Sequence, residues 1–349
     1  MRTTTLLTTA RFAKHGEPFA PVALPHTWNA KDGQDGGNDY WRGVGTYEIA
    51  LPDPTDGKRQ YIEFKGANHV ATVYCNGRLL GQHKGGFSTF RFDLTPAMKK
   101  SGNLLRVDVS NAPSDIYPQT ADFTFFGGLY REVSFIETAP AHFDLLKAGT
   151  PAVFVTPIVS GTTRVDLFPV DADGCTVSVD LKDAAGCVVA SGSAPAGAHT
   201  VLTLSVKNPH LWNGMAGPYC YTAEASILRG EEAVDTVSVD YGYRSFHVDP
   251  NTGFWLNGKN VPLHGVSRHQ DRLDKGWAIS RADHEQDLAL IKEVGANTIR
   301  LAHYQHDQYF YDLCDHAGFV LWAEIPFISR FIPGQEAHDN TLSQMTELV

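Results

Sequence analysis

The hydrophobic period of the chain changes near residue 250, and this change constrains the fold more than any other feature of the sequence. Before it, short alternating runs such as "TYEIALP", "YIEFKG" and "NLLRVDVS" indicate strands with one buried face. After it, "SRADHEQDLALIKEVG", "NTIRLAH", "DQYFYDLCDHAG" and "FVLWAEIP" alternate between helical and strand patterns. The sequence therefore predicts an all-β region followed by parallel β-α-β-α-β units.

The all-β region is predicted to contain two sandwiches, because 349 residues exceed what one hydrophobic core usually organises. Within residues 1–140, Asn76-Gly77 separates two alternating stretches, a strong hairpin signal because both residues tolerate positive φ. This segment is expected to form an antiparallel sandwich. Residues 141–247 contain further strand-like runs, including "TRVDLFPV" and "HTVLTLSV", separated by turn residues. They predict a smaller all-β domain with a spacer and packing role.

Residues 248–349 carry the helical signals. Ser280 and Asp283 predict a capping box at the start of one helix. Leu288 and Val294 belong to its predicted apolar face, and Gly295 is expected to end it. The strands around this helix and the next one are predicted to be parallel and buried on both faces.

Polar side chains occur at or near the carboxyl ends of three successive predicted strands. They are His269 after the first, Arg300 and His303 at the second, and Glu324 at the third. Ligands of parallel α/β sheets and barrels bind at these ends, so the four side chains are expected to converge. In the alternative interpretation, the role of these residues is structural. The hydrogen bonds of the two histidines are satisfied at the edge of the sheet, Arg300 pairs with Glu324, and the four side chains only close the mouth of the barrel.

Several stretches resemble glycoside hydrolase family 2, the β-galactosidase and β-glucuronidase family. "NTIRLAHYQHDQYFYDLCDHAGFVLWAEIP" is similar to a signature of its catalytic barrel. "LPHTWN", "GVGTYEIALP", "YCNGRLLGQHKGGFSTFRFDLT" and "DFTFFGGLYREV" resemble its jelly-roll domain, and "PHLWN" and "YGYRSFHVDPNTGFWLNGKNVPLHGVSRHQD" resemble the passage into the barrel. The resemblance implies a sugar-binding jelly roll at 1–140, an immunoglobulin-like sandwich at 141–247 and the N-terminal part of a (β/α)8 TIM barrel at 248–349.

The resemblance also implies roles for particular residues. Asp122 matches a jelly-roll aspartate that binds the terminal sugar and, in some β-galactosidases, a sodium ion. His269 and His303 match histidines that line the subsite of the nonreducing sugar. Arg300 matches a position next to the nucleophile, and Glu324 is expected to line the active site. A guanidinium at that position favours the ionised form of a nearby carboxylate.

The sequence also departs from the family pattern. Leu301-Ala302 replaces the usual pair of small residues before His-Tyr-Pro, and Gln305 replaces the proline. "IPFISRF" lacks a clear counterpart of the magnesium-binding Glu and His of some β-galactosidases, so magnesium is not expected. No W-x-x-x-N-E motif precedes Val349. The acid/base and nucleophile glutamates are therefore expected beyond Val349, and the chain alone is expected to be inactive.

The resemblance implies a retaining β-glycosidase acting on terminal β-D-galactosides, with β-glucuronides as the alternative substrate. Retaining enzymes of this type use two carboxyl groups. The alternative from another class is a non-catalytic carbohydrate-binding or structural protein, because two sandwiches precede the barrel segment and the catalytic pair is missing. The expected partner is an oligosaccharide or β-galactoside, and the family's habit of forming dimers and tetramers suggests a homo-oligomer.

Charge and composition narrow the remaining classes. A net charge of −10 argues against nucleic acid and anionic membranes as partners. No apolar run approaches the length of a membrane helix, and no G-x-x-x-x-G-K-[ST] motif is present. The five cysteines are odd in number and lack C-x-x-C spacing, which favours free thiols in a reducing compartment. A cytoplasmic protein is expected.

Overall fold

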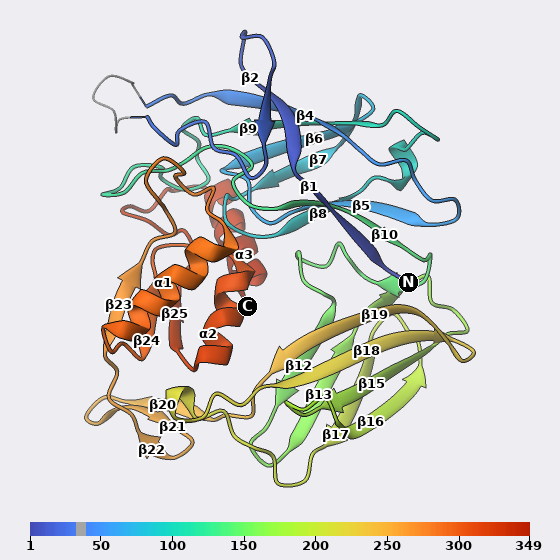
Figure 1. The fold of residues 1–349 in the computed structure, drawn as a ribbon, viewed down its shortest axis with the longest axis vertical. Coiled ribbons are helices and arrows are strands. Elements are labelled where there is room, and N and C mark those ends of the chain that lie inside the picture. Colours follow the sequence, from blue (N-terminus) through green and yellow to red (C-terminus); the bar gives the residue numbers. More distant parts are fainter. Residues whose placement is uncertain (33–39) are drawn as a thin grey trace.

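The computed structural model describes residues 1–32 and 40–349 and has three parts. In Figure 1, the N-terminal sandwich lies at the top, a second sandwich lies at the lower right, and a mixed α/β part in orange and red lies on the left. The order along the chain, two β-sandwiches followed by an α/β part, agrees with the prediction from the sequence.

The N-terminal sandwich consists of two antiparallel sheets, with the orders β3-β2-β4-β9-β6-β7 and β1-β10-β5-β8. Its strands are β1 (Thr3–Leu7), β2 (Thr9–Lys14), β3 (Ala20–Ala23), β4 (Val44–Ala50), β5 (Arg59–Phe64), β6 (Val70–Cys75), β7 (Arg78–Lys84), β8 (Phe90–Asp93), β9 (Leu104–Ser110) and β10 (Val133–Thr138), with a 3-10 turn η1 (Thr95–Ala97). Alternate residues of β4 and β9, such as Tyr47 and Val107, are fully buried in its core. The predicted hairpin is confirmed, since Asn76 and Gly77 join β6 to β7 with φ of 50° and 83°.

The second sandwich packs a three-stranded sheet, β12-β13-β17, against a four-stranded sheet, β16-β15-β18-β19. Its elements are β11 (His142–Phe143), β12 (Val153–Pro157), β13 (Thr162–Leu167), β14 (Pro169–Val170), β15 (Thr176–Lys182), β16 (Val188–Pro195), β17 (Thr200–Ser205), η2 (Gly214–Ala216), β18 (Tyr221–Arg229) and β19 (Glu232–Tyr241). Inward residues of the central strands, such as Val177, Val179 and Ala225, are fully buried in a separate core. The alternation read from the sequence therefore has its expected origin in two packed sheets.

The third part begins with a small antiparallel sheet and continues with the parallel one. Its elements are β20 (Phe246–Asp249), β21 (Gly253–Leu256), β22 (Lys259–Asn260), β23 (Gly265–Arg268), α1 (Arg281–Glu293), β24 (Thr298–Leu301), α2 (Gln308–Ala317), β25 (Val320–Ala323) and α3 (Gln335–Leu348). Strands β23, β24 and β25 pair in parallel and in chain order. The predicted β-α-β-α-β succession is confirmed.

The predicted boundaries of α1 are correct, but one of its predicted core residues is not. Ser280 and Asp283 form both bonds of the capping box. The chain leaves the helix before Gly295, which has a φ of 82°. Leu288 packs against the core beneath the helix. Val294, predicted on the apolar face, is instead the C-cap residue and is 73% exposed.

The expectation that the parallel strands are buried on both faces is only partly met. Ile299 and Leu301 of β24 are fully buried. Trp322 of β25 is 67% exposed. Strand β25 pairs only with β24 within the described residues, so one side of it has no neighbouring strand.

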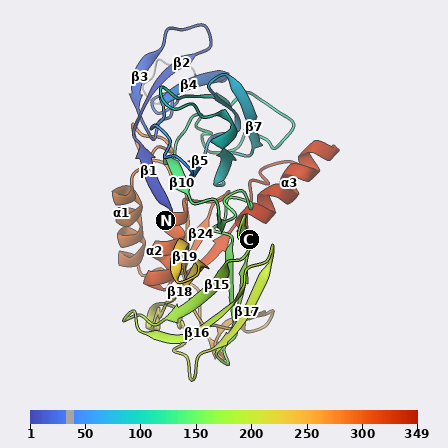
Figure 2. The same cartoon turned by 90° about the vertical axis from the view of Figure 1, so that its right-hand side faces the viewer.

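Helix α3 lies against β7 of the N-terminal sandwich, as Figure 2 illustrates. The Asn340 side-chain amide donates to the Lys84 carbonyl at 2.7 Å. Lys84 also pairs with Glu336, and His83 lies 3.0 Å from Glu347. The contact between β7 and α3, the last element of the chain, is therefore mainly polar.

An aromatic cluster joins the N-terminal sandwich to the α/β part. Phe87, Phe125 and Tyr130 from the sandwich pack with Trp277 and Tyr304. The Phe87 and Tyr304 rings are parallel, with centroids 4.1 Å apart. This contact between buried rings holds loops of the sandwich over the carboxyl ends of the parallel strands. Within residues 1–32 and 40–349, no helix combines the length and apolarity needed to cross a membrane.

Candidate functional site

The carboxyl ends of the three parallel strands bring the predicted polar residues together. His269 directly follows β23, His303 lies two residues beyond β24, and Glu324 directly follows β25. The imidazole rings of His269 and His303 meet edge to face with centroids 5.2 Å apart. The expected convergence of these strand ends is therefore present in the structure.

Arg300 and Glu324 form a two-pronged ion pair. Arg300 Nε lies 2.5 Å from Glu324 Oε1, and its Nη2 lies 3.1 Å from Oε2. Burial raises the pKa of Glu324, but the hydrogen bonds and the charge of Arg300 outweigh it and hold that pKa below its ordinary value. The pairing considered as a purely structural alternative is thus present, and it keeps Glu324 ionised at the mouth of the sheet.

The same guanidinium orients His303. Arg300 Nη2 lies 2.9 Å from His303 Nδ1. His303 Nδ1 also lies 3.3 Å from Glu324 Oε2. A guanidinium can only donate hydrogen bonds, so in the shorter contact Nδ1 accepts, and a neutral ring in this contact has its proton on Nε2. The ring is partly exposed and can therefore offer a donor to a ligand.

The sandwich contributes a loop to this group. The Phe123 ring lies 4.9 Å from the His269 ring and 5.5 Å from the His303 ring, centroid to centroid. Asp122, its neighbour in the chain, is exposed. Burial and the charge of His303 lower the pKa of His269, and the negative charge of Asp122 acts in the opposite direction. Asp122 therefore lies within electrostatic reach of His269, although it comes from a different domain.

The described residues do not provide a side-chain metal centre. In residues 1–32 and 40–349, no group of three or more His, Cys, Asp or Glu side chains could hold a metal ion. Asp122 thus has no such partners for sodium, and the segment after β25 has none for magnesium. The sodium site at Asp122 stays a prediction.

Two aromatic residues of the site were missed in the sequence. The Phe123 ring lies 5.7 Å from the Tyr304 ring, centroid to centroid, and the Tyr304 hydroxyl lies 3.4 Å from His269 Nδ1. The aromatic run "DFTFF" in an otherwise polar loop was the available signal for Phe123. Gln305, which replaces the family's proline, donates from its side chain to the Gln344 carbonyl of α3 at 3.0 Å.

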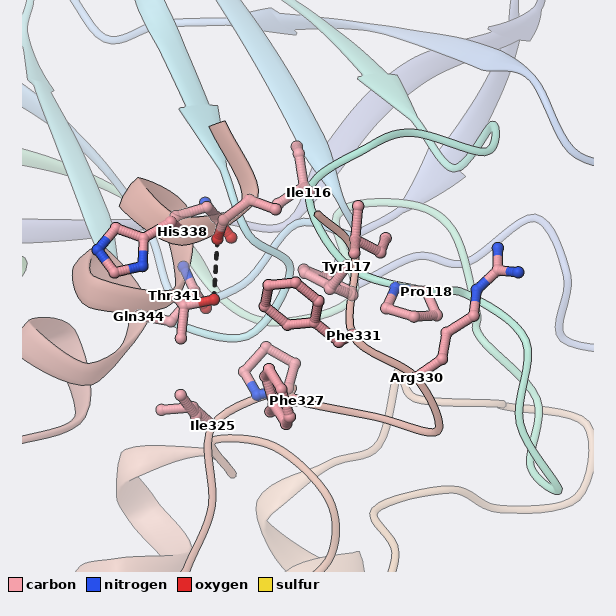
Figure 3. Close-up of a pocket in the computed structure, with 14 residues that line it drawn as sticks. Ile116, Tyr117, Pro118, Ile325, Phe327, Arg330, Phe331, His338, Thr341 and Gln344 are labelled. Atoms are coloured by element: carbon pink, nitrogen blue, oxygen red, sulfur yellow. Dashed lines mark hydrogen bonds between the residues drawn. The ribbon is translucent and has the colours of Figure 1, made fainter. Parts of the chain in front are cut away.

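An apolar hollow of about 160 Å³ lies next to the segment that begins at Ile325, directly after Glu324 in the chain. Tyr117 and Pro118 of the sandwich line one side, and Phe327 and Phe331, which follow β25, line another (Figure 3). His338 and Thr341 of α3 lie at its margin. The hollow suits an apolar group better than a sugar ring, which carries a hydroxyl on most carbons.

Two β-sandwiches followed by a βα-barrel segment, with two imidazoles and a carboxylate at its strand ends, define a modular protein with a polar site at the barrel mouth. Family models agree in chain order. "Glycosyl hydrolases family 2, sugar binding domain" matches residues 18–139, "Glycosyl hydrolases family 2" matches 159–244, and "Glycosyl hydrolases family 2, TIM barrel domain" matches 248–346. The chain belongs to glycoside hydrolase family 2, as the sequence resemblance predicted.

Individual relatives agree with the family models. A β-glucuronidase of Bacteroides fragilis is 38% identical over 352 residues, covering 94% of this chain and 50% of the relative. The β-galactosidase BoGH2A of Bacteroides ovatus is 34% identical, covering 86% of this chain and 37% of the relative. The crystal structure of an FMN-binding β-glucuronidase from Faecalibacterium prausnitzii L2-6 superimposes with a TM-score of 0.94 at 44% identity, covering 100% of this chain and 56% of that one. The chain spans about half the length of the relatives that it matches.

Proposed function

We propose that the protein is a retaining β-glycosidase that acts on terminal β-D-glucuronides, and that residues 1–349 supply the part of its site that holds the sugar. The observation that carries this proposal is the meeting of the Asp122–Phe123 loop with His269 and His303 at the strand ends. It is supported by family membership and by the names of the relatives.

The choice of sugar follows from the relatives. The sequence resemblance ranked β-galactosides first. Two relatives, at 38% and 44% identity, are named β-glucuronidases. A relative named β-galactosidase is 34% identical. We therefore place β-glucuronides first and keep β-galactosides as the second candidate.

Each side chain receives a role from its geometry. The Asp122 carboxylate is free to accept two sugar hydroxyls, each through a charge-assisted bond. His303 donates from Nε2 to a hydroxyl, and the partly buried His269 serves as a neutral hydrogen-bonding group. Arg300 holds Glu324 ionised and His303 in place. Because its charge is offset by Glu324, we do not assign recognition of the sugar carboxylate to Arg300.

The apolar hollow lined by the segment after Glu324 is proposed to accept the group attached to the sugar. Its lining by Phe327, Phe331 and Tyr117 favours an apolar or aromatic leaving group. The two catalytic glutamates are placed outside residues 1–349, so the chain alone is proposed to be inactive. We also propose a cytoplasmic location, which the five free cysteines support, and assembly as a homo-oligomer.

Hydrolysis of a panel of nitrophenyl β-D-glycosides tests this proposal. A polypeptide that carries the complete barrel is expected to cleave the glucuronide with at least about tenfold higher kcat/KM than the galactoside, which corresponds to about 1.4 kcal/mol. The 349-residue chain, used as the control, is expected to show no turnover above background.

The other outcomes separate the alternatives. A preference for the galactoside would move the assignment to the second candidate. Absence of turnover on every glycoside by the longer polypeptide, together with sugar binding, would favour the non-catalytic class. Robust turnover by residues 1–349 would refute the placement of the catalytic glutamates.

A further inference from the structure

Arg131, in the last loop of the N-terminal sandwich before β10, is buried between the sandwich and the α/β part. Its side chain is 5% exposed. A buried guanidinium requires hydrogen-bond acceptors, because leaving it unpaired away from water costs several kcal/mol. Its partners therefore show which segments it connects.

Two acceptors belong to the sandwich. Arg131 Nη1 donates to the Lys65 carbonyl, just after β5, at 3.0 Å. It also donates to the Phe87 carbonyl, in the loop between β7 and β8, at 2.5 Å. These two bonds attach the Nη1 side of the guanidinium to the N-terminal sandwich.

The other two acceptors belong to the loops that carry the site histidines. Arg131 Nη2 donates to Gln270 Oε1 at 3.0 Å and to the Gln305 carbonyl at 2.8 Å. Gln270 directly follows His269, and Gln305 lies two residues after His303. One planar group thus connects the sandwich to both histidine loops.

Among residues 1–32 and 40–349, the charge of Arg131 has one loose partner. Asp307 Oδ2 lies 3.8 Å from Arg131 Nε, and the other oxygen of Asp307 accepts from the Tyr309 amide at the start of α2. Most of the donors of Arg131 are therefore used on uncharged acceptors in four separate segments. A lysine, with its single ammonium, cannot span this set.

We propose that Arg131 is a positioning residue of the sugar site, which sets the His269 and His303 loops against the sandwich without touching the sugar. The proposal rests on the proposed function in assigning sugar to these histidines. The geometric part of it, the fixing of two loops by one guanidinium, stands independently of the reaction.

Hydrogen exchange of backbone amides in the 349-residue chain tests the geometric part without any sugar. In Arg131→Gln, amides at 269–276 and 302–307 are expected to exchange roughly tenfold faster or more, as expected for the loss of bonds from a charged donor. Arg131→Lys is expected to resemble Arg131→Gln, since it keeps the charge but not the fork.

Arg91→Gln is the matched control. Arg91 is also at a domain boundary, with its side chain 10% exposed, but it donates to the Leu145 and Thr150 carbonyls and pairs with Glu63. This variant is expected to speed exchange near residues 144–150 and to leave the histidine loops unchanged. In the longer polypeptide, Arg131→Gln is expected to lower kcat/KM by tenfold or more, and Arg91→Gln is expected to leave it within twofold of the unsubstituted protein.

Three results would overturn the proposal. They are unchanged exchange in both histidine loops of Arg131→Gln, an equal rise throughout the chain in both arginine variants, and full restoration by Arg131→Lys. If Arg131→Gln does not fold, Gln270→Met decides: faster exchange at 269–276 supports the proposal, and unchanged exchange there refutes it. Loss of glycosidase activity in every protein, with the exchange pattern intact, would refute the proposed function alone.

Discussion

The titration behaviour of single side chains at the strand ends follows from two opposing effects. Burial favours the neutral imidazole of His269, whereas the ion pair with Arg300 favours the charged carboxylate of Glu324. Near neutral pH the site thus combines a neutral histidine with an ionised acid. Such a pair offers sugar hydroxyls both hydrogen-bond donors and acceptors.

Asp122→Asn is predicted to act on both binding and titration. The aspartate raises the pKa of His269 against the larger effect of burial, so its loss should lower that pKa further. In the longer polypeptide, kcat/KM should fall by roughly 10- to 100-fold, as expected for a lost charge-assisted hydrogen bond of about 1.5–3 kcal/mol. Histidine NMR titration and steady-state kinetics measure the two effects.

Asp115→Asn provides the comparison, because Asp115 is another exposed aspartate of the same sandwich and the substitution removes the same charge. It should leave both quantities close to those of the unsubstituted protein. An equal loss of activity in the two variants would indicate a general charge effect and contradict the role given to Asp122.

The sequence predicted the polar residues of the site but not the groups that hold them. His269, His303 and Glu324 could be predicted because strand ends follow from the hydrophobic periodicity, and the carboxyl ends of parallel strands lie at one edge of the sheet. Phe123 and Arg131 could not be predicted, because their roles depend on how the sandwich packs against the α/β part. Long-range packing of this kind has no local pattern in the sequence.

At the level of elements, helix α2 depends on a close contact at its C-terminal end. Gly318 follows the helix with a φ of 83°, and a Cβ placed there would lie 2.5 Å from the backbone of Gly214 in η2. The end of α2 therefore meets the second sandwich with no room for a side chain. Asp307 caps the other end through the Tyr309 amide.

Gly318→Ala is predicted to destabilise the protein more than Gly295→Ala. Both glycines end a helix at nearly the same positive φ, 83° and 82°, but a Cβ at Gly295 would meet nothing within 4 Å. Gly295→Ala should cost about 1 kcal/mol from backbone strain alone. Gly318→Ala adds a clash with backbone that cannot move aside cheaply. Urea unfolding followed by circular dichroism measures both, and equal losses would refute the close contact.

Elements with strong local signals were predicted well, and elements that depend on distant partners were not. The α1 capping box and the Asn76-Gly77 hairpin are set by residues a few positions apart. Helix α3 was missed. Its N-cap residue, Gly334, has no side chain that could cap the helix. Polar bonds to Lys84 in the N-terminal sandwich hold the helix in place.

The whole molecule contains several histidines that folding keeps neutral. Burial lowers the pKa of His26 and His69 to about 4, and burial followed by the charge of Arg268 does the same for His284. In the unfolded chain each should titrate near its ordinary value of about 6.5. These groups lie in the sandwich and the α/β part, so their protonation opposes folding in more than one domain.

Stability is therefore predicted to fall on acidification. Above about pH 6.5 these histidines are neutral in both states, so their contribution to stability is fully present. As the pH falls from 6.5 towards 4, only the unfolded chain takes up protons on them, and the folded state loses stability. At pH 5 each group should cost about 1–2 kcal/mol. Urea unfolding at pH 7.5 and pH 5, at constant ionic strength, measures this change, and equal or greater stability at pH 5 would contradict it.

A sugar titration followed through the histidine NMR signals tests most directly whether one sugar site is formed by two domains. D-glucuronate should shift the ring signals of both His269 and His303 in the 349-residue chain, with a single saturation curve and an affinity of about millimolar. In Asp122→Asn, both curves should weaken together. Shifts of only one histidine, two different saturation curves, or no shift of either ring would contradict the account.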